Sequence, residues 1–251
     1  MKRKKVSLGK KKLEKIFKLI LSRDFEEAKN RIPANVRHYP LAIKNADGFS
    51  SLDNCPLLHY AARYDGCDIV KYLLDGGADI ELKGGQGDTP LITAARCGDK
   101  KCCKLLLDRG ANINARPATN TSPLIAASCH GHVDICRLLV ERGADIDACV
   151  NDGTTSLHFA VWYDRYSIIM CLLSAGAQMT KDQEGVTPLE MAKKRKNGHS
   201  VWLLENYSVS VNLSGVISRG LHQSNPFSDF LVFDQICDAR LFIIVANFAY
   251  N

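Results

Sequence analysis

The chain has 251 residues, 46% of them apolar and 24% charged, a composition typical of a folded protein and not of a disordered chain. Its formal net charge is +6, but residues 1–18 hold nine Lys or Arg against one Glu, a net +8, so residues 19–251 together carry −2. Nucleic-acid binding is therefore not expected of most of the chain, because it has little positive charge to hold phosphates.

Residues 1–12, "MKRKKVSLGKKK", form a basic N-terminal arm. Such an arm suits a nuclear-import signal, a tether to an anionic surface or a solvated tail, and the sequence leaves these three interpretations open. No apolar secretion segment follows Met1, and no apolar run is long enough to span a bilayer. We therefore expect a cytoplasmic or nuclear protein, or both, that does not use a membrane.

Residues 13–52 are predicted to close the N-terminal end of a helical stack. The stretch Leu13–Ile32 places apolar residues at helical spacing on both sides of Asp24-Phe25, which predicts a helix, a turn and a second helix. From Ile32 to Leu73 the chain advances 41 positions, against a spacing of 33 downstream. We therefore expect an insertion of about eight residues in a loop around Pro33, Pro40 and Asp47-Gly48.

A repeat of 33 residues fills the middle of the chain. Its most regular feature is a Gly-Ala pair that follows an apolar helix end, where glycine can take the positive φ that terminates a helix. The four pairs are Gly77-Ala78, Gly110-Ala111, Gly143-Ala144 and Gly176-Ala177. A fixed period of this length indicates one structural unit copied and stacked.

Each unit also carries a helix-start signal upstream of the Gly-Ala pair. A hydroxyl side chain can accept from the first free backbone N–H groups of a helix, and proline at the first helical position loses no hydrogen bond. The signals are Thr89-Pro90, Ser122-Pro123, Thr155-Ser156 and Thr187-Pro188. Each unit therefore reads as a turn, a short helix, a turn and a longer helix.

These two linked motifs resemble those of the ankyrin-repeat family. The T-P-L-H-x-A-A and L-L-x-x-G-A-D/N elements of that family are matched by "TPLITAARCGD", "SPLIAASCHGH" and "TSLHFA" with the Gly-Ala pairs. The resemblance implies an all-α solenoid of about six helix-turn-helix units with short β-hairpin turns. It assigns residues 53–206 to ankyrin repeats, with a degenerate capping repeat and loop at 13–52 and a lysine-rich helix as the C-terminal cap.

The family resemblance also implies a concave binding face, formed by the hairpin tips and the ends of the short helices. Register places two residues of each unit there, and none of these ten residues is acidic. The predicted partner-binding residues are Arg63, Tyr64, Arg96, His130, Trp162, Tyr163, Lys194 and Arg195. Arginine, tyrosine and tryptophan are typical interface anchors, so we expect a protein partner with an acidic segment, bound by a monomer. Hairpin tips, Asp88 among them, are expected on the same face.

Catalytic and metal chemistry are not predicted. The ten cysteines are scattered without paired C-x-x-C clusters, so no metal site or disulfide framework is expected, and Cys102, Cys136 and Cys171 are predicted core residues. Gly84–Asp88 lacks the Lys-Ser/Thr of a phosphate loop and is expected to be a turn. His59 and His158 occupy the motif histidine position, where the ring is expected to hold adjacent turns together. We expect no enzyme and no cofactor.

A second function remains open, that of a substrate-recognition subunit of a cullin-type ubiquitin ligase. The stretch Thr119–Leu124 and the repeats around it look similar to Fem-type receptors, in which a T-N-S-T-P-L turn precedes the corresponding helix. The departure is that residues 207–251 show no cullin-docking helix. A DNA-linked nuclear cofactor is a third reading, permitted by the basic arm.

Residues 207–251 form a C-terminal tail of uncertain structure. The repeat pattern stops, and the sequence becomes β-branched with a short apolar period. Packing on the last repeat, a small strand unit and a chain end with little structure all remain possible for it.

Overall fold

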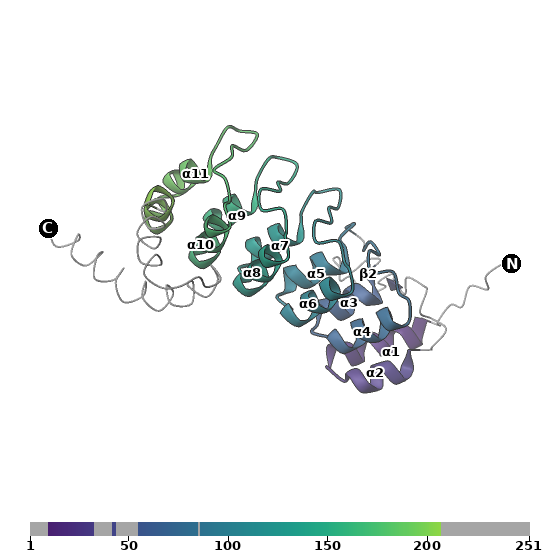
Figure 1. Ribbon diagram of the computed structural model, residues 1–251. Helices are drawn as coiled ribbons and strands as arrows, with labels where there is room; N and C mark the ends of the chain where they lie inside the picture. Colours follow the sequence, from purple (N-terminus) through teal and green to yellow (C-terminus); the bar gives the residue numbers. More distant parts are fainter. Residues whose placement is uncertain (1–9, 33–41, 44–54, 85, 207–251) are drawn as a thin grey trace, which may run out of the picture. The chain divides into compact units, whose positions relative to one another are not determined.

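The computed structural model describes residues 10–32, 42–43, 55–84 and 86–206. These residues form successive helix pairs, each joined by a tight turn (Figure 1). The pairs are α1 (Lys10–Leu21) with α2 (Phe25–Arg31), α3 (Leu57–Arg63) with α4 (Cys67–Asp75), α5 (Pro90–Cys97) with α6 (Lys100–Asp108), α7 (Pro123–His130) with α8 (Val133–Glu141), α9 (Ser156–Trp162) with α10 (Tyr166–Ser174), and α11 (Pro188–Arg195) with a helix over 198–206.

The pairs stack so that like helices contact like helices. The first helices α3, α5, α7, α9 and α11 each pack on the next, and the second helices α4, α6, α8 and α10 form a parallel row. Hairpin loops extend from one side of this stack (Figure 1), and one of them closes with a bridge between Cys149 and Thr155. The prediction of an all-α solenoid of about six helix-turn-helix units is confirmed.

The helix-start residues cap as their chemistry predicts. Oγ of Thr89, Ser122, Thr155 and Thr187 each accepts a hydrogen bond from the backbone N–H three residues later. Each helix of this set then has one free N–H group of its first turn satisfied without a contribution from the neighbouring repeats. The glycines of the Gly-Ala pairs have φ between 83° and 90°, so they do occupy the left-handed region.

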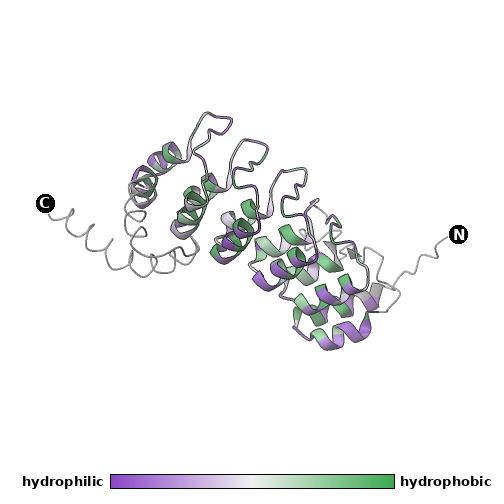
Figure 2. Ribbon diagram, viewed as in Figure 1, coloured by the Kyte–Doolittle hydropathy of each residue, from purple (hydrophilic) through white to green (hydrophobic). Residues whose placement is uncertain are grey.

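Small and apolar side chains fill the space between neighbouring pairs. Alanine pairs of the first helices are buried, among them Ala61-Ala62 and Ala94-Ala95, and this lets α3, α5 and α7 approach closely. Figure 2 shows hydrophobic residues concentrated on α5 and α7, whereas α2 and α11, at the two ends of the array, carry mostly hydrophilic ones. The hydrophilic helices suit the ends, because an end has no further repeat to cover it.

The three cysteines predicted to lie in the core are buried in it, which confirms that prediction. Burial raises the pKa of Cys136 to about 12 and that of Cys171 to about 11, and it contributes to a raised pKa at Cys102, where a hydrogen bond with Cys67 is the larger cause. These thiols are therefore protonated at neutral pH and pack as small apolar groups.

The N-terminal pair covers the first full repeat, with α2 against α4 and α1 against α3. Ile16, Ile20 and Ala28 are fully buried there, and α1 begins at Lys10, three residues before the predicted helix-turn-helix. Between this pair and α3 the structure describes only the antiparallel strands β1 (Ala42–Ile43) and β2 (Cys55–Pro56). Most of the predicted insertion, the arm over 1–9 and the tail over 207–251 lie outside the described residues.

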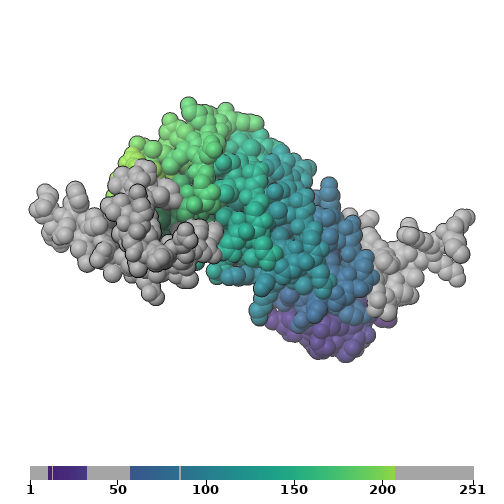
Figure 3. Space-filling model, in the orientation of Figure 1, coloured from purple at the N-terminus to yellow at the C-terminus, as the bar shows by residue number. Residues whose placement is uncertain are grey.

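The repeats form a continuous packed surface from the purple N-terminal pair to the green C-terminal pair (Figure 3). Within the described residues, no helix is long and apolar enough to cross a membrane. The exposed side chains of the stack, with the hairpin tips beside them, form the surface to which a partner can bind.

Candidate protein-binding face

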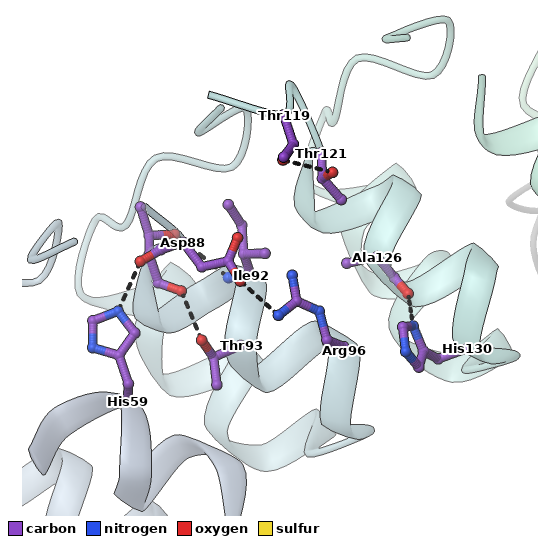
Figure 4. A network of polar contacts seen from close by, with 10 residues as sticks. His59, Asp88, Ile92, Thr93, Arg96, Thr119, Thr121, Ala126 and His130 are labelled. Atoms are coloured by element: carbon purple, nitrogen blue, oxygen red, sulfur yellow. Dashed lines mark hydrogen bonds and ion pairs between the residues drawn. The ribbon is translucent and has the colours of Figure 1, made fainter. Parts of the chain in front are cut away.

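Buried histidines fix the hairpin loops onto the helices. Nε2 of His59 donates to the backbone oxygen of Asp88 at 2.8 Å, and Nε2 of His158 donates to that of Val186 at 3.1 Å (Figure 4 shows the first). Burial lowers the pKa of both rings, so they are neutral near pH 7. The prediction that these histidines hold adjacent turns together is confirmed.

Amide side chains join successive hairpin tips. Nδ2 of Asn120 donates to Oδ1 of Asn151 at 2.7 Å, and Nδ2 of Asn151 donates back to the Ala118 oxygen at 3.0 Å. Nε2 of Gln183 then donates to the backbone oxygen of Asn151 at 2.7 Å. These bonds hold three consecutive tips in a fixed relation, and a surface held in this way loses little entropy when a partner binds.

The binding row, by which we mean the eight predicted partner-binding residues, begins at the end of α3 with Arg63 and Tyr64. The Arg63 guanidinium lies 5.8 Å from the centre of the Tyr64 ring, and that ring lies 4.7 Å from the ring of Tyr60. Arg63 is exposed and forms no ion pair with a carboxylate in the described part of the chain. It is therefore a cation available to a partner.

Arg96 has a different environment. Its guanidinium pairs with the Asp88 carboxylate at 2.6 Å, and the side chains are 30% and 9% exposed (Figure 4). Although no acidic residue occurs among the ten register positions, the folded hairpin brings one to Arg96. A partner carboxylate would have to compete with Asp88 for this arginine, so Arg96 is a weaker candidate contact than the sequence indicates.

The C-terminal part of the row combines exposed aromatic rings with cations. Trp162 is 45% exposed and Tyr163 47%, and the Arg195 guanidinium lies 4.1 Å above the Trp162 ring. Lys194 is exposed on the same helix α11, which packs against α9. Trp, Tyr and Arg are enriched at the centres of protein interfaces, so this end of the row is the strongest candidate for a binding surface.

His130, the remaining predicted residue, is partly engaged with the backbone. Its Nδ1 donates to the Ala126 oxygen at 2.9 Å (Figure 4), and its ring stacks at 6.3 Å on that of His132. His132 in turn donates through Nε2 to the Arg96 oxygen at 3.0 Å. Each of these rings therefore has one nitrogen bound to the backbone, and no group of three or more metal-ligating side chains occurs among the described residues.

The sequence reasoning missed Arg165 as a candidate contact. The residue lies 33 positions after His132 and, like it, reaches back to the preceding repeat, so that its side chain lies against Gly131. The repeat register was the available signal, because it assigns the two side chains equivalent positions. Arg165 is exposed and forms no ion pair with a carboxylate of the described residues.

These features define a repeat protein that presents a surface: the stacked helix pairs, the histidines that bind the hairpin backbones, and the exposed row. Comparison with known families agrees, since the model of ankyrin repeats matches residues 58–149 and 117–183, which together span about half of the chain. The chain belongs to the ankyrin-repeat family. Ankyrin repeats generally mediate protein–protein interaction. No curated protein matches the chain, so the similarity to Fem-type receptors finds no support there.

Proposed function

We propose that this chain is a non-catalytic module that binds a protein partner through the binding row, and that the partner presents an acidic segment. The observation that carries the proposal is the Arg195 guanidinium, whose Cζ lies over the exposed Trp162 ring at 4.1 Å from its centre. A cation over an aromatic ring is held without using up the hydrogen-bond donors of the guanidinium. Those donors can bind a carboxylate through two parallel hydrogen bonds while the indole contacts the neighbouring side chain.

The charge distribution along the row supports an acidic partner. Arg63, Lys194 and Arg195 are exposed, and none of them pairs with a carboxylate in the part of the chain that the structure describes. Arg96, by contrast, is neutralised by Asp88. The anion-binding contribution is therefore assigned to the two ends of the row, with Arg96 contributing mainly to the stability of the hairpin.

An affinity-capture experiment with matched variants tests the proposal. Four baits are used in cell extract: the native chain, Trp162→Ala, Arg63→Glu and the control Lys104→Gln, whose lysine is exposed on α6 and outside the row. Captured proteins are compared by mass spectrometry. Captured partners are then purified and their affinities measured. We expect Trp162→Ala to lower the affinity for a directly bound partner at least about tenfold, and Lys104→Gln to leave that affinity unchanged. Equal affinity of all four baits would refute the placement of the site.

The same experiment separates the second candidate function, a substrate-recognition subunit of a cullin-type ubiquitin ligase. The observation behind it is the Thr119–Leu124 turn, in which the Thr119 and Thr121 hydroxyls hydrogen-bond at 3.0 Å at an exposed hairpin tip (Figure 4). A ligase receptor would retain cullin subunits with every variant and lose only its substrates with Trp162→Ala. A plain binding module, monomeric and located in the cytoplasm, the nucleus or both, would retain no ligase subunits.

A further inference from the structure

The arginines of the described residues differ in whether they pair with a carboxylate. Six of them pair with a carboxylate, and Arg137 has interactions of its own. The paired residues are Arg23, Arg31, Arg96, Arg109, Arg116 and Arg142. The three arginines without such a carboxylate are Arg63, Arg165 and Arg195. Two of them, Arg165 and Arg195, lie close to Trp162 and Tyr163 at the C-terminal end of the row, although Arg165 is not one of its eight residues.

Arg165 and Arg195 both lie near the Trp162-Tyr163 pair, Arg165 because it follows Tyr163 closely in the chain and Arg195 because α11 packs against α9. Arg165 begins the turn into α10, and its Cζ and Nε lie 3.0 Å from the position that a Cβ on Gly131 would take, directly over the end of α7. Tyr163, two residues earlier, interacts with Cys129 in the last turn of the same α7. Arg195 comes from α11, and its Cζ lies over the ring of Trp162, the residue next to Tyr163.

The electrostatics of Tyr163 agree with this convergence. The neighbouring Cys129 raises the pKa of the Tyr163 hydroxyl, whereas Arg165 and Arg195 both act to lower it. Lys194, exposed on α11 beside Arg195, adds a further positive charge to this end of the row.

We propose that Arg165, Arg195 and the Tyr163 hydroxyl form a phosphate-binding site, and that the partner segment which docks here carries a phosphorylated residue beside a side chain that contacts Trp162. This inference rests on the proposed function and deepens it. A carboxylate has a single negative charge, which one guanidinium matches. A phosphorylated side chain has a charge of about −1.5 to −2 and three acceptor oxygens, which match two guanidinium forks and a hydroxyl.

Peptide libraries provide a test that does not require the partner to be known. The probes are four immobilised libraries with a fixed central phosphoserine, phosphothreonine, phosphotyrosine or glutamate and random flanks, each phosphorylated library paired with its unmodified form. The purified chain is applied as wild type, as Arg165→Gln with Arg195→Gln, as Arg195→Lys and as the control Lys104→Gln.

We expect the wild type and Lys104→Gln to retain at least one phosphorylated library about tenfold better than the unmodified and glutamate libraries. The double variant loses this preference, and Arg195→Lys reduces it, because an ammonium keeps the charge without the planar fork. Wild-type binding that does not distinguish the phosphorylated libraries from the others would overturn the inference. Thermal melts of each variant show whether a loss of binding follows from unfolding.

The proposed function fails by a different outcome. If a captured partner depends on Trp162 but binds equally well before and after phosphatase treatment, the binding row stands and the phosphate site is wrong. If partner binding is unaffected by Trp162→Ala, the row itself is wrong, whatever the peptide libraries retain.

Discussion

Replacing Asp99 by Asn is expected to stabilise the stack at neutral pH. Asp99 caps α6, where Oδ1 accepts from the Cys102 N–H at 2.9 Å, while Oδ2 is buried without a hydrogen-bond partner. Two residues at the same register position donate to the end of the preceding first helix, His132 to the Arg96 oxygen and Asn197 to the Val161 oxygen. An ionised Asp99 has no proton to donate, whereas Asn keeps the cap and supplies an N–H₂ group.

The expected gain is the difference between two effects. Relief of the unpaired buried oxygen and a new hydrogen bond contribute about 1–2 kcal/mol, and loss of the negative charge at the helix start costs about 0.5 kcal/mol. The net gain is about 1 kcal/mol at pH 7, which raises the Tm of a stack of this length by about 2–4 °C.

The gain should also depend on pH. Burial raises the pKa of Asp99, so protonation is easier in the folded protein than in the unfolded chain. The folded protein thus gains stability relative to the unfolded chain as pH falls through the raised pKa, and protonated Asp99 can donate as Asn does. The advantage of Asp99→Asn should therefore shrink below that pKa.

Urea unfolding followed by circular dichroism at pH 7 and at pH 4 measures both effects. The matched control is Asp24→Asn, because Asp24 caps α2 through the Glu27 N–H but is exposed. We expect this control to lose about 0.5 kcal/mol, mainly from the missing charge at the helix start. An Asp99→Asn protein that is less stable than wild type at pH 7, or a gain that does not change with pH, would refute the reasoning.

Three further predictions concern the same stack. Gly98→Ala should lower the free energy of unfolding by about 2 kcal/mol, because the new Cβ would lie 2.6 Å from a ring atom of His132. Gly110 has a similar φ but open space around it, so Gly110→Ala should lower the free energy of unfolding by about 1 kcal/mol. Equal losses for the two variants would contradict this reasoning. Arg96→Glu should lower the free energy of unfolding by about 2 kcal/mol, because it places a second carboxylate beside Asp88. An unchanged melting temperature would contradict the Arg96–Asp88 pairing. Stability should fall as pH drops below about 6.5, because burial lowers the pKa of His158, and His158→Gln should reduce that slope in pH-dependent melts.

The helices and their order could be predicted because their signals are local. The hydroxyl of Thr89 lies three residues from the N–H that it caps, and Gly110 takes its positive φ within the turn that it forms. Repetition at a fixed spacing then shows which faces must be buried, since only stacked copies can cover them. The same repeat register predicted the row of residues that contains Trp162 and Arg195.

Tertiary structure decided which members of that row remain available. Asp88 reaches Arg96 because the hairpin folds back over α5, and Arg195 lies over Trp162 because α11 packs on α9. Oδ2 of Asp99 is buried without a hydrogen-bond donor, which the sequence does not show. These features depend on side-chain directions and distances across neighbouring units. The sequence by itself determined the repeating unit, since capping and turn chemistry act within a few residues, whereas the pairing of charges was decided by packing, which alone sets the distances between side chains of different repeats.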